Sequence, residues 1–230
     1  MNSSPYQHVA TAASAVSSSA PQLLQLALRL RKHHSKFLLL LAQILHHDRR
    51  RLGQELFIAQ LPLAAPDASF DLVVSMYGAM FAPRPERVAT ELLRVCRSGG
   101  QIAMANWTPS GFIGQMFKVN AAHVPPPAGM PSPVLWGDEA TVRERLRNGI
   151  ADLKIERVQA QLRYPFSVAD TVAFHRTHLG PARMAIEATP VDQRAALEHE
   201  MVGLYEKYNR AKDGTVWVES EYLEVVATRA

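Results

Sequence analysis

The feature that most constrains this 230-residue chain is a strand, a helix and a second strand in succession between residues 70 and 106. Residues 70–77 are almost all apolar, which predicts a strand buried on both faces, as in a parallel sheet. Residues 84–97 have helical apolar spacing, and Gly99-Gly100 predicts where that helix ends. Residues 101–106 predict the second strand. Two strands joined in this way form a βαβ unit, so we expect an α/β fold.

The rest of the chain predicts further elements on both sides of a proline-rich loop at residues 125–133. We expect a strand at 151–163, and Asp213-Gly214 predicts a turn before the end of the chain. Further helices and a final strand pair are expected at these positions: helices at 111–124, 138–147, 168–178 and 191–210, and strands at 215–218 and 222–228.

The first sixty residues differ from the remainder in charge and composition. Residues 1–60 hold seven basic and two acidic residues, whereas residues 61–230 hold 18 basic and 19 acidic ones. We therefore divide the chain into an atypical, low-complexity, basic and helical or irregular segment at 1–60 and a globular region at 61–230. The globular region has no excess charge that would favour nucleic acid as a partner.

Several classes of protein and site are disfavoured by short patterns. The apolar run at 37–45 has nine residues, whereas a membrane-spanning helix needs about 20, so no membrane span is expected. A lone cysteine, Cys96, excludes an intramolecular disulfide and fits a reducing compartment, which predicts a cytoplasmic protein. His33-His34 and His46-His47 lack neighbouring carboxylates or thiols that would complete a metal site, so we expect no metal.

Three phrases of the sequence carry a resemblance to a known family. They are the segment 66–75, the segment 91–100 that ends in Ser98-Gly99-Gly100, and the segment 106–117 that begins Asn106-Trp107. In this order and at these distances they resemble the class I S-adenosylmethionine-dependent methyltransferases, specifically those similar to the ubiquinone and menaquinone biosynthesis enzymes. The resemblance covers about residues 61–230. It implies a partial Rossmann-like sheet, strands four to seven with flanking helices, and methyl transfer from S-adenosylmethionine to a small-molecule acceptor.

The half of the family domain that binds the cofactor has no recognisable counterpart here. In the family a Gly-rich turn follows strand one, yet Gly53 is the only glycine before residue 78. Residues 57–62 also lack the acid that the family places near this point. The activity of this chain is therefore open, and the alternative is a non-catalytic methyltransferase remnant or interaction module. The change in composition at residue 60 also admits a frameshifted first segment.

The resemblance places the strand at 70–77 beside strand one in the middle of a sheet. Without that neighbour it would be an exposed apolar edge, through which the protein could associate with itself. We hypothesise that the Leu-rich segments at 23–30 and 37–45 cover this edge.

The resemblance also implies where ligands bind. Ser75, Met76, Tyr77 and Gly78, with Met80 nearby, match the positions that face the cofactor, although the methionines fit an ordinary core equally well. Asn106 and Trp107 leave the next strand at the carboxyl edge of the sheet, where substrates bind in open α/β folds. Trp107 is either the wall of an aromatic acceptor site or a packing residue. The candidates for a catalytic base are His123, Tyr164, His175 and His178.

Overall fold

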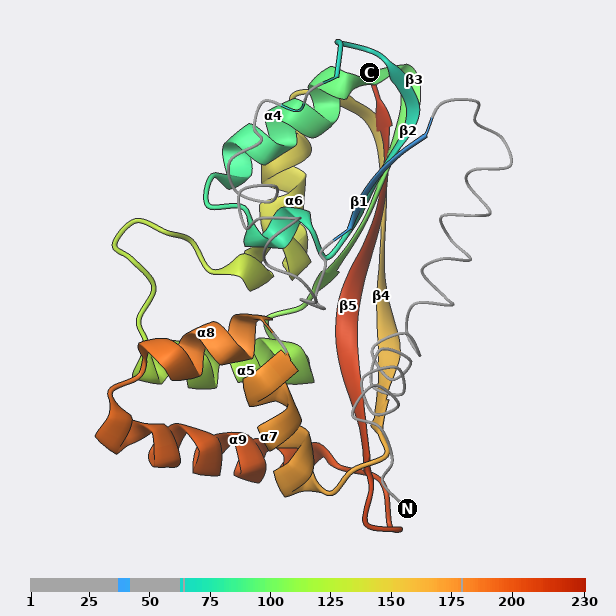
Figure 1. Ribbon diagram of the computed structural model, residues 1–230. Helices are drawn as coiled ribbons and strands as arrows, with labels where there is room; N and C mark the ends of the chain where they lie inside the picture. The colour runs from blue at the N-terminus through green and yellow to red at the C-terminus, as the bar shows by residue number, and fades with distance from the viewer. Residues whose placement is uncertain (1–36, 42–62, 64, 179) are drawn as a thin grey trace, which may run out of the picture.

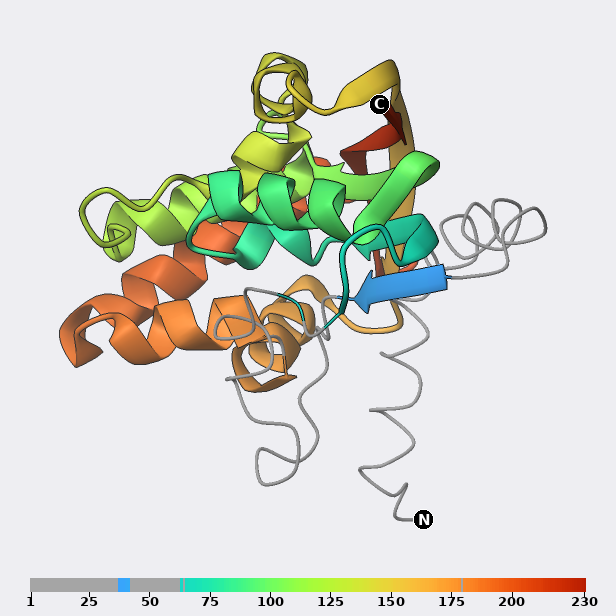
Figure 2. The ribbon, with the colours of Figure 1, turned by 90° about the horizontal axis from the view of Figure 1, so that it is seen from above.

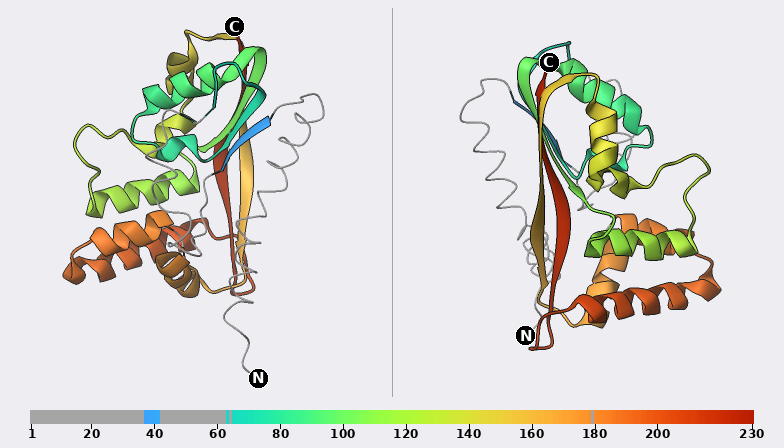
Figure 3. Two further views of the ribbon diagram at one scale, coloured as in Figure 1. Left: turned by 45° about the horizontal axis from the view of Figure 1, so that its top comes forward. Right: turned by 180° about the vertical axis from the view of Figure 1, so that it is seen from behind.

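A computed structural model describes residues 37–41, 63, 65–178 and 180–230. Its centre is a five-stranded sheet in the order β1-β2-β3-β5-β4, which confirms the α/β fold class. The labelled helices lie to one side of this sheet (Figure 1). They form two groups: α4 and α6 lie beside β2 and β3, whereas α5, α7, α8 and α9 lie towards the far end of the β4–β5 ribbon, as Figures 2 and 3 also show.

Three parallel strands form one half of the sheet. They are β1 (Phe37–Leu41), β2 (Phe70–Met76) and β3 (Cys96–Trp107). Leu39 pairs with Val74, and Val74 pairs with Ala103 on the other side. The apolar composition of β2 fits its position, because its last five residues are buried.

The expectation of an exposed edge at β2 is wrong, because β1 pairs along it in parallel. This pairing confirms the hypothesis that the 37–45 segment covers β2, for residues 37–41. The segment 23–30 and residues 42–45 lie outside the described part of the chain. A parallel neighbour supplies the backbone hydrogen bonds that an edge strand would otherwise offer to another molecule.

The other half of the sheet is an antiparallel ribbon of β4 (Ile150–Tyr164) and β5 (Val216–Arg229). The expected pair of strands at 215–218 and 222–228 is therefore one continuous strand. The burial of β5 alternates along most of its length, as expected for a strand with one face on the core. Residues 101–107 of β3 pair with β5, so the ribbon extends well beyond the parallel strands.

The helices agree with the sequence in most places. The structure has α4 (Pro85–Val95), α5 (Phe112–His123), α6 (Glu139–Leu146), α7 (Val168–His178), α8 (Gly180–Ala188) and α9 (Arg194–Tyr208), with 3-10 turns η1 (Ala79–Phe81), η2 (Pro133–Gly137) and η3 (Val191–Gln193).

Two helical predictions are wrong. Helix α4 ends at Val95 and β3 begins at Cys96, so Gly99 and Gly100 lie in a strand and not in a helix cap. The α8 helix was not expected at all. It begins with Gly180-Pro181, and proline is well tolerated in the first turn of a helix.

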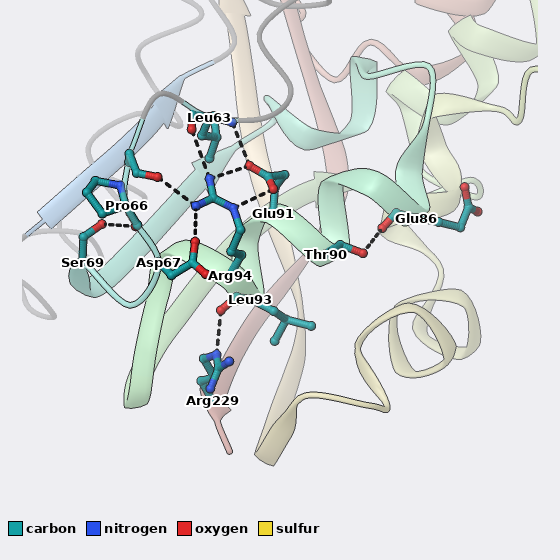
Figure 4. Close-up of polar contacts among 11 residues, drawn as sticks. Leu63, Pro66, Asp67, Ser69, Glu86, Thr90, Glu91, Leu93, Arg94 and Arg229 are labelled. Atoms are coloured by element: carbon teal, nitrogen blue, oxygen red, sulfur yellow. Dashed lines mark hydrogen bonds and ion pairs between the residues drawn. The ribbon is translucent and has the colours of Figure 1, made fainter.

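Arg94, in the last turn of α4, fixes the segment that leads into β2 (Figure 4). Its guanidinium donates to both carboxylate oxygens of Glu91 at 2.8 Å and to Asp67 at 2.7 Å. It also donates to the carbonyl oxygens of Leu63 and Ala65 at 3.0 and 2.8 Å. These contacts use the donors of one planar fork, so the position of β2 is tied to α4.

The described residues contain neither a membrane-spanning helix nor a cluster of metal ligands. No helix in this part of the chain is long and apolar enough to cross a bilayer. Nor do the described residues contain a group of three His, Cys, Asp or Glu side chains arranged to hold a metal ion. Cys96 is fully buried, and burial raises the pKa of its thiol to about 11, so it is not a thiolate at neutral pH.

Candidate functional site at the carboxyl edge of the parallel strands

The carboxyl ends of β2 and β3 meet at one edge of the sheet, because these strands are parallel neighbours. Tyr77 follows β2, and its backbone N–H donates to the carbonyl oxygen of Ala105 in β3 at 2.8 Å. The structure therefore brings Tyr77, predicted on the cofactor side, next to Asn106 and Trp107, predicted on the substrate side.

The rings of Tyr77 and Trp107 are stacked, with centroids 4.3 Å apart and planes 10° from parallel. Tyr222 of β5 meets both rings edge-on, at 6.3 and 6.2 Å. All three residues are buried. Tyr77 thus covers one face of the Trp107 ring, so an acceptor ring could not stack on that face.

Tyr77 has an unusual backbone and an unpaired side chain. Its φ of 55° lies in the left-handed region, which a bulky residue seldom adopts and which costs about 1–3 kcal/mol. Its hydroxyl is buried and has no hydrogen-bond partner. Burial, with a smaller contribution from Tyr222, raises the pKa of Tyr77 well above its ordinary value, so the phenol is protonated at neutral pH. Such strain at a strand end is typical of ligand sites.

Asn106 is the most informative residue of the site. It is completely buried, yet neither its amide oxygen nor its amide nitrogen has a hydrogen-bond partner. More than about 90% of buried backbone polar groups and most buried side-chain polar atoms are paired in folded proteins, because an unpaired one costs about 1–3 kcal/mol. Asn106 therefore carries a donor and an acceptor that the fold leaves unused at this edge.

The other residues predicted on the cofactor side serve the fold. The Ser75 hydroxyl oxygen accepts the backbone N–H of Ala79 at 3.0 Å, which holds the η1 turn that begins after Gly78. Met76 and Met80 are buried in the core, which agrees with the alternative interpretation of both residues.

The turn η2 packs directly against the end of β3. A Cβ atom on Gly137 would lie 2.0 Å from the carbonyl oxygen of Trp107, so only glycine permits this approach. Its neighbour Trp136 is 1% exposed, and its indole N–H has no partner. No sequence pattern indicates this contact, because residues 125–133 predicted a loop whose path depends on tertiary packing. Tyr222 was expected only as a strand residue.

The four candidate bases have other partners. Tyr164 and His175 pack edge to face at 5.1 Å, and a His175 ring nitrogen lies 3.1 Å from the hydroxyl of Tyr205. Burial lowers the pKa of His175 to about 3, so it is neutral at pH 7.

The other two candidate bases also have partners elsewhere. His123 lies 3.1 Å from Glu200, and His178 stacks on Phe174 at 4.4 Å. None of these contacts involves Tyr77, Asn106 or Trp107, so the described structure does not bring a predicted base to this edge.

The described residues fit only part of the ligand that the sequence resemblance implies. Asn106 and Tyr77 offer unused polar atoms to a polar ligand at the carboxyl edge. β1 occupies the position beside β2 that strand one takes in the family, but residues 42–52, which follow it, contain no glycine. A backbone turn that closely approaches a cofactor would need glycine there. The Gly-rich turn of the family therefore has no equivalent in this sequence.

Comparison with known proteins identifies a family match and several similar proteins. Residues 40–104 match the methyltransferase domain family, a stretch that runs from β1 into β3. The Mycobacterium tuberculosis protein Rv1405c is 35% identical over 180 residues, which are 76% of this chain and 63% of that protein. Rv1403c of the same organism is 45% identical over 98 residues, 42% of this chain and 35% of that protein. The matched region thus spans about a third of the length of Rv1403c and somewhat less than two thirds of the length of Rv1405c.

Among solved structures, the Bacillus halodurans protein BH2331 is similar with a TM-score of 0.44 and 14% identity. The superposition covers 88% of this chain and 97% of that one. The family match over residues 40–104, the order of the strands and the motifs at 66–117 show that this chain contains a methyltransferase domain of the class I S-adenosylmethionine-dependent type.

Proposed function

We propose that this chain takes part in methyl transfer from S-adenosylmethionine to a small-molecule acceptor bound at the carboxyl edge of β2 and β3. The observation that carries the proposal is the buried amide of Asn106, whose oxygen and nitrogen have no partner in the protein. A buried polar group without a protein partner calls for an explanation, and a ligand that uses both of its atoms supplies one. Family membership supports the reaction class.

The chemistry asks little of the protein beyond positioning. The sulfonium of S-adenosylmethionine is an activated methyl donor, so alignment of the acceptor supplies most of the catalysis. On this proposal Asn106 donates to one ligand atom and accepts from another, and the Tyr77 hydroxyl offers a further polar contact. The stacked rings of Tyr77 and Trp107 make the ends of β2 and β3 rigid.

Titration calorimetry with S-adenosylhomocysteine tests the proposal on the full chain. We expect saturable binding, weakened at least about tenfold by Asn106→Ala, because a buried amide that loses a ligand contact costs about 1–3 kcal/mol. Asn209→Ala is the matched control, since the Asn209 amide is occupied by hydrogen bonds to Thr215, Ala211 and Trp217. Folded wild-type protein that takes up no S-adenosylhomocysteine would contradict the proposal.

A second function is favoured by the sequence after β1. Because residues 42–52 contain no glycine, a non-catalytic module that keeps the sheet but does not bind the cofactor is the alternative. The same titration separates the two functions. The module would be supported by a folded protein that does not bind S-adenosylhomocysteine. Its melting temperature would nevertheless rise with another small molecule, and the melting temperature of Asn106→Ala would not.

A further inference from the structure

A second site lies away from the carboxyl edge, in a groove between α4 and α6 with a volume of about 970 Å³. Thr90 and Leu93 of α4 form part of one wall, and Thr141 and Arg145 of α6 form part of the other. Figure 4 shows the α4 side, with Glu86, Thr90 and Arg94 on the helix and Arg229 beside Leu93. Four arginines and two glutamates line the groove, so its lining is net positive.

Most of the charged groups in this groove already have partners. Arg94 is bound by Glu91 and Asp67, and Arg147 is paired with Glu144 at 3.0 Å. Arg229 donates to the carbonyl oxygens of Leu93 and Ala230. These arginines are therefore committed to the fold.

Arg145 is different. Its Nη1 is buried and has no hydrogen-bond partner, although the residue lines the groove. The guanidinium lies 4.5 Å from the centre of the Trp136 indole, which is itself almost fully buried. This stacking holds the planar fork in one orientation without using any of its N–H donors. An arginine stays charged in a protein, so a guanidinium held in one orientation by Trp136 lines an open, net positive groove.

We propose that the α4–α6 groove binds an oxyanion, a carboxylate or phosphate group of a small molecule, through Arg145. A guanidinium pre-oriented by an aromatic ring loses little entropy when it binds the two oxygens of such a group. The hydroxyls of Thr90 and Thr141 and the amide of Asn148 line the same groove and offer neutral hydrogen bonds. Glu86 on the α4 wall opposes any anion there, which favours a small ligand held on the α6 side.

The test is a titration of the full chain with inorganic phosphate and, separately, with acetate, at constant ionic strength. Trp136 reports binding through its fluorescence, because its ring contacts Arg145, and Trp136→Phe shows how much of the signal is local. We expect saturable binding of at least one anion, weakened about tenfold or more by Arg145→Gln. Arg143→Gln is the matched control, because Arg143 lies on the exposed side of α6 and pairs with Glu139.

Each result decides the proposal. Tighter binding of phosphate would identify a phosphate group as the ligand, and tighter binding of acetate a carboxylate. Absence of saturable binding, or equal affinities in the wild type and Arg145→Gln, would overturn the proposal. If Arg145→Gln does not fold, Arg145→Lys keeps the charge but lacks the planar fork. An affinity for Arg145→Lys equal to that of the wild type would then overturn it.

Discussion

Two buried aromatic clusters within the described residues differ in how their polar atoms are paired. In the helical cluster, His175 and Tyr205 are within hydrogen-bond distance of each other, and Tyr164 packs against both rings. At the carboxyl edge, the Tyr77 hydroxyl of the second cluster has no partner, and neither has the amide of Asn106, the residue before Trp107 in β3. Both clusters are shielded from water, so the difference does not arise from solvent exposure.

The comparison distinguishes a core from a site. The helical cluster is closed, since its polar groups are used within the protein, and it needs no ligand to explain it. The edge cluster combines unpaired polar atoms with a left-handed Tyr77, and both features cost stability without any structural return. Costs of this kind are expected where a fold is shaped for binding.

The largest effect on stability should follow from disrupting the close contact between η2 and β3. In Gly137→Ala the new methyl group would lie 2.0 Å from the carbonyl oxygen of Trp107, so the backbone must move. We expect a loss of about 3 kcal/mol or more in the free energy of unfolding, measured in urea. Gly203→Ala in α9 is the control, because nothing lies within 4 Å of its Cβ, and it should gain up to about 1 kcal/mol. Equal stabilities would mean that η2 does not pack on β3 in this way.

The next largest effect is a dependence of stability on pH that arises in the helical cluster. His175 has a folded-state pKa of about 3 because it is buried, whereas an unfolded histidine titrates near about 6.5. Between these values the unfolded chain binds a proton that the folded chain does not bind. Stability is therefore full above the unfolded pKa and falls as the pH decreases, by up to about 1.4 kcal/mol per pH unit.

Urea unfolding between about pH 7 and pH 4 measures this slope in the wild type and in His175→Gln. Carboxylates with lowered pKa values, such as Glu91 and Asp138, also lose their contribution in acid, so only the difference between the two proteins is assigned to His175. Parallel curves for the two proteins would show that His175 is not buried in the neutral form.

A smaller but more selective effect compares two tyrosines. Tyr205→Phe removes the hydroxyl that contacts His175 and should cost about 1–2 kcal/mol, because the imidazole loses its partner. Tyr77→Phe removes a hydroxyl that has no partner and should leave stability unchanged or raise it by about 1 kcal/mol. Thermal and urea unfolding of both variants checks the contrast. Losses of similar size at both positions would remove the distinction between the two clusters.

The sequence predicted the parts of the fold whose signal is local. The apolar run of β2 and the amphipathic spacing of α4 were found because each depends on neighbouring residues alone. The strand β1 was recognised only as an apolar segment that could cover β2, since a run of leucines does not distinguish a strand from a helix. The single long β5 was split in two, because the polar residues at 219–221 separate two more apolar stretches.

The candidate site was predicted in part. The motifs placed Tyr77, Asn106 and Trp107 at the carboxyl edge, and the structure brings them together. Whether a buried amide has a partner depends on every chain segment that packs around it, so the unpaired state of Asn106 had no signal in the sequence. The same reason explains why Trp136 and Arg145 were missed, since a stack between a loop and a helix is a purely tertiary contact.

The central claim is that the amide of Asn106 is kept for a ligand and not for the fold. The direct test is the free energy of unfolding of Asn106→Ala without ligand, measured beside Asn209→Ala. We predict that Asn106→Ala is within about 0.5 kcal/mol of the wild type or more stable, because it removes an unpaired buried group. Asn209→Ala should lose about 2 kcal/mol with its three hydrogen bonds. A loss of about 2 kcal/mol or more in Asn106→Ala as well would contradict the claim, since the amide would then be part of the fold.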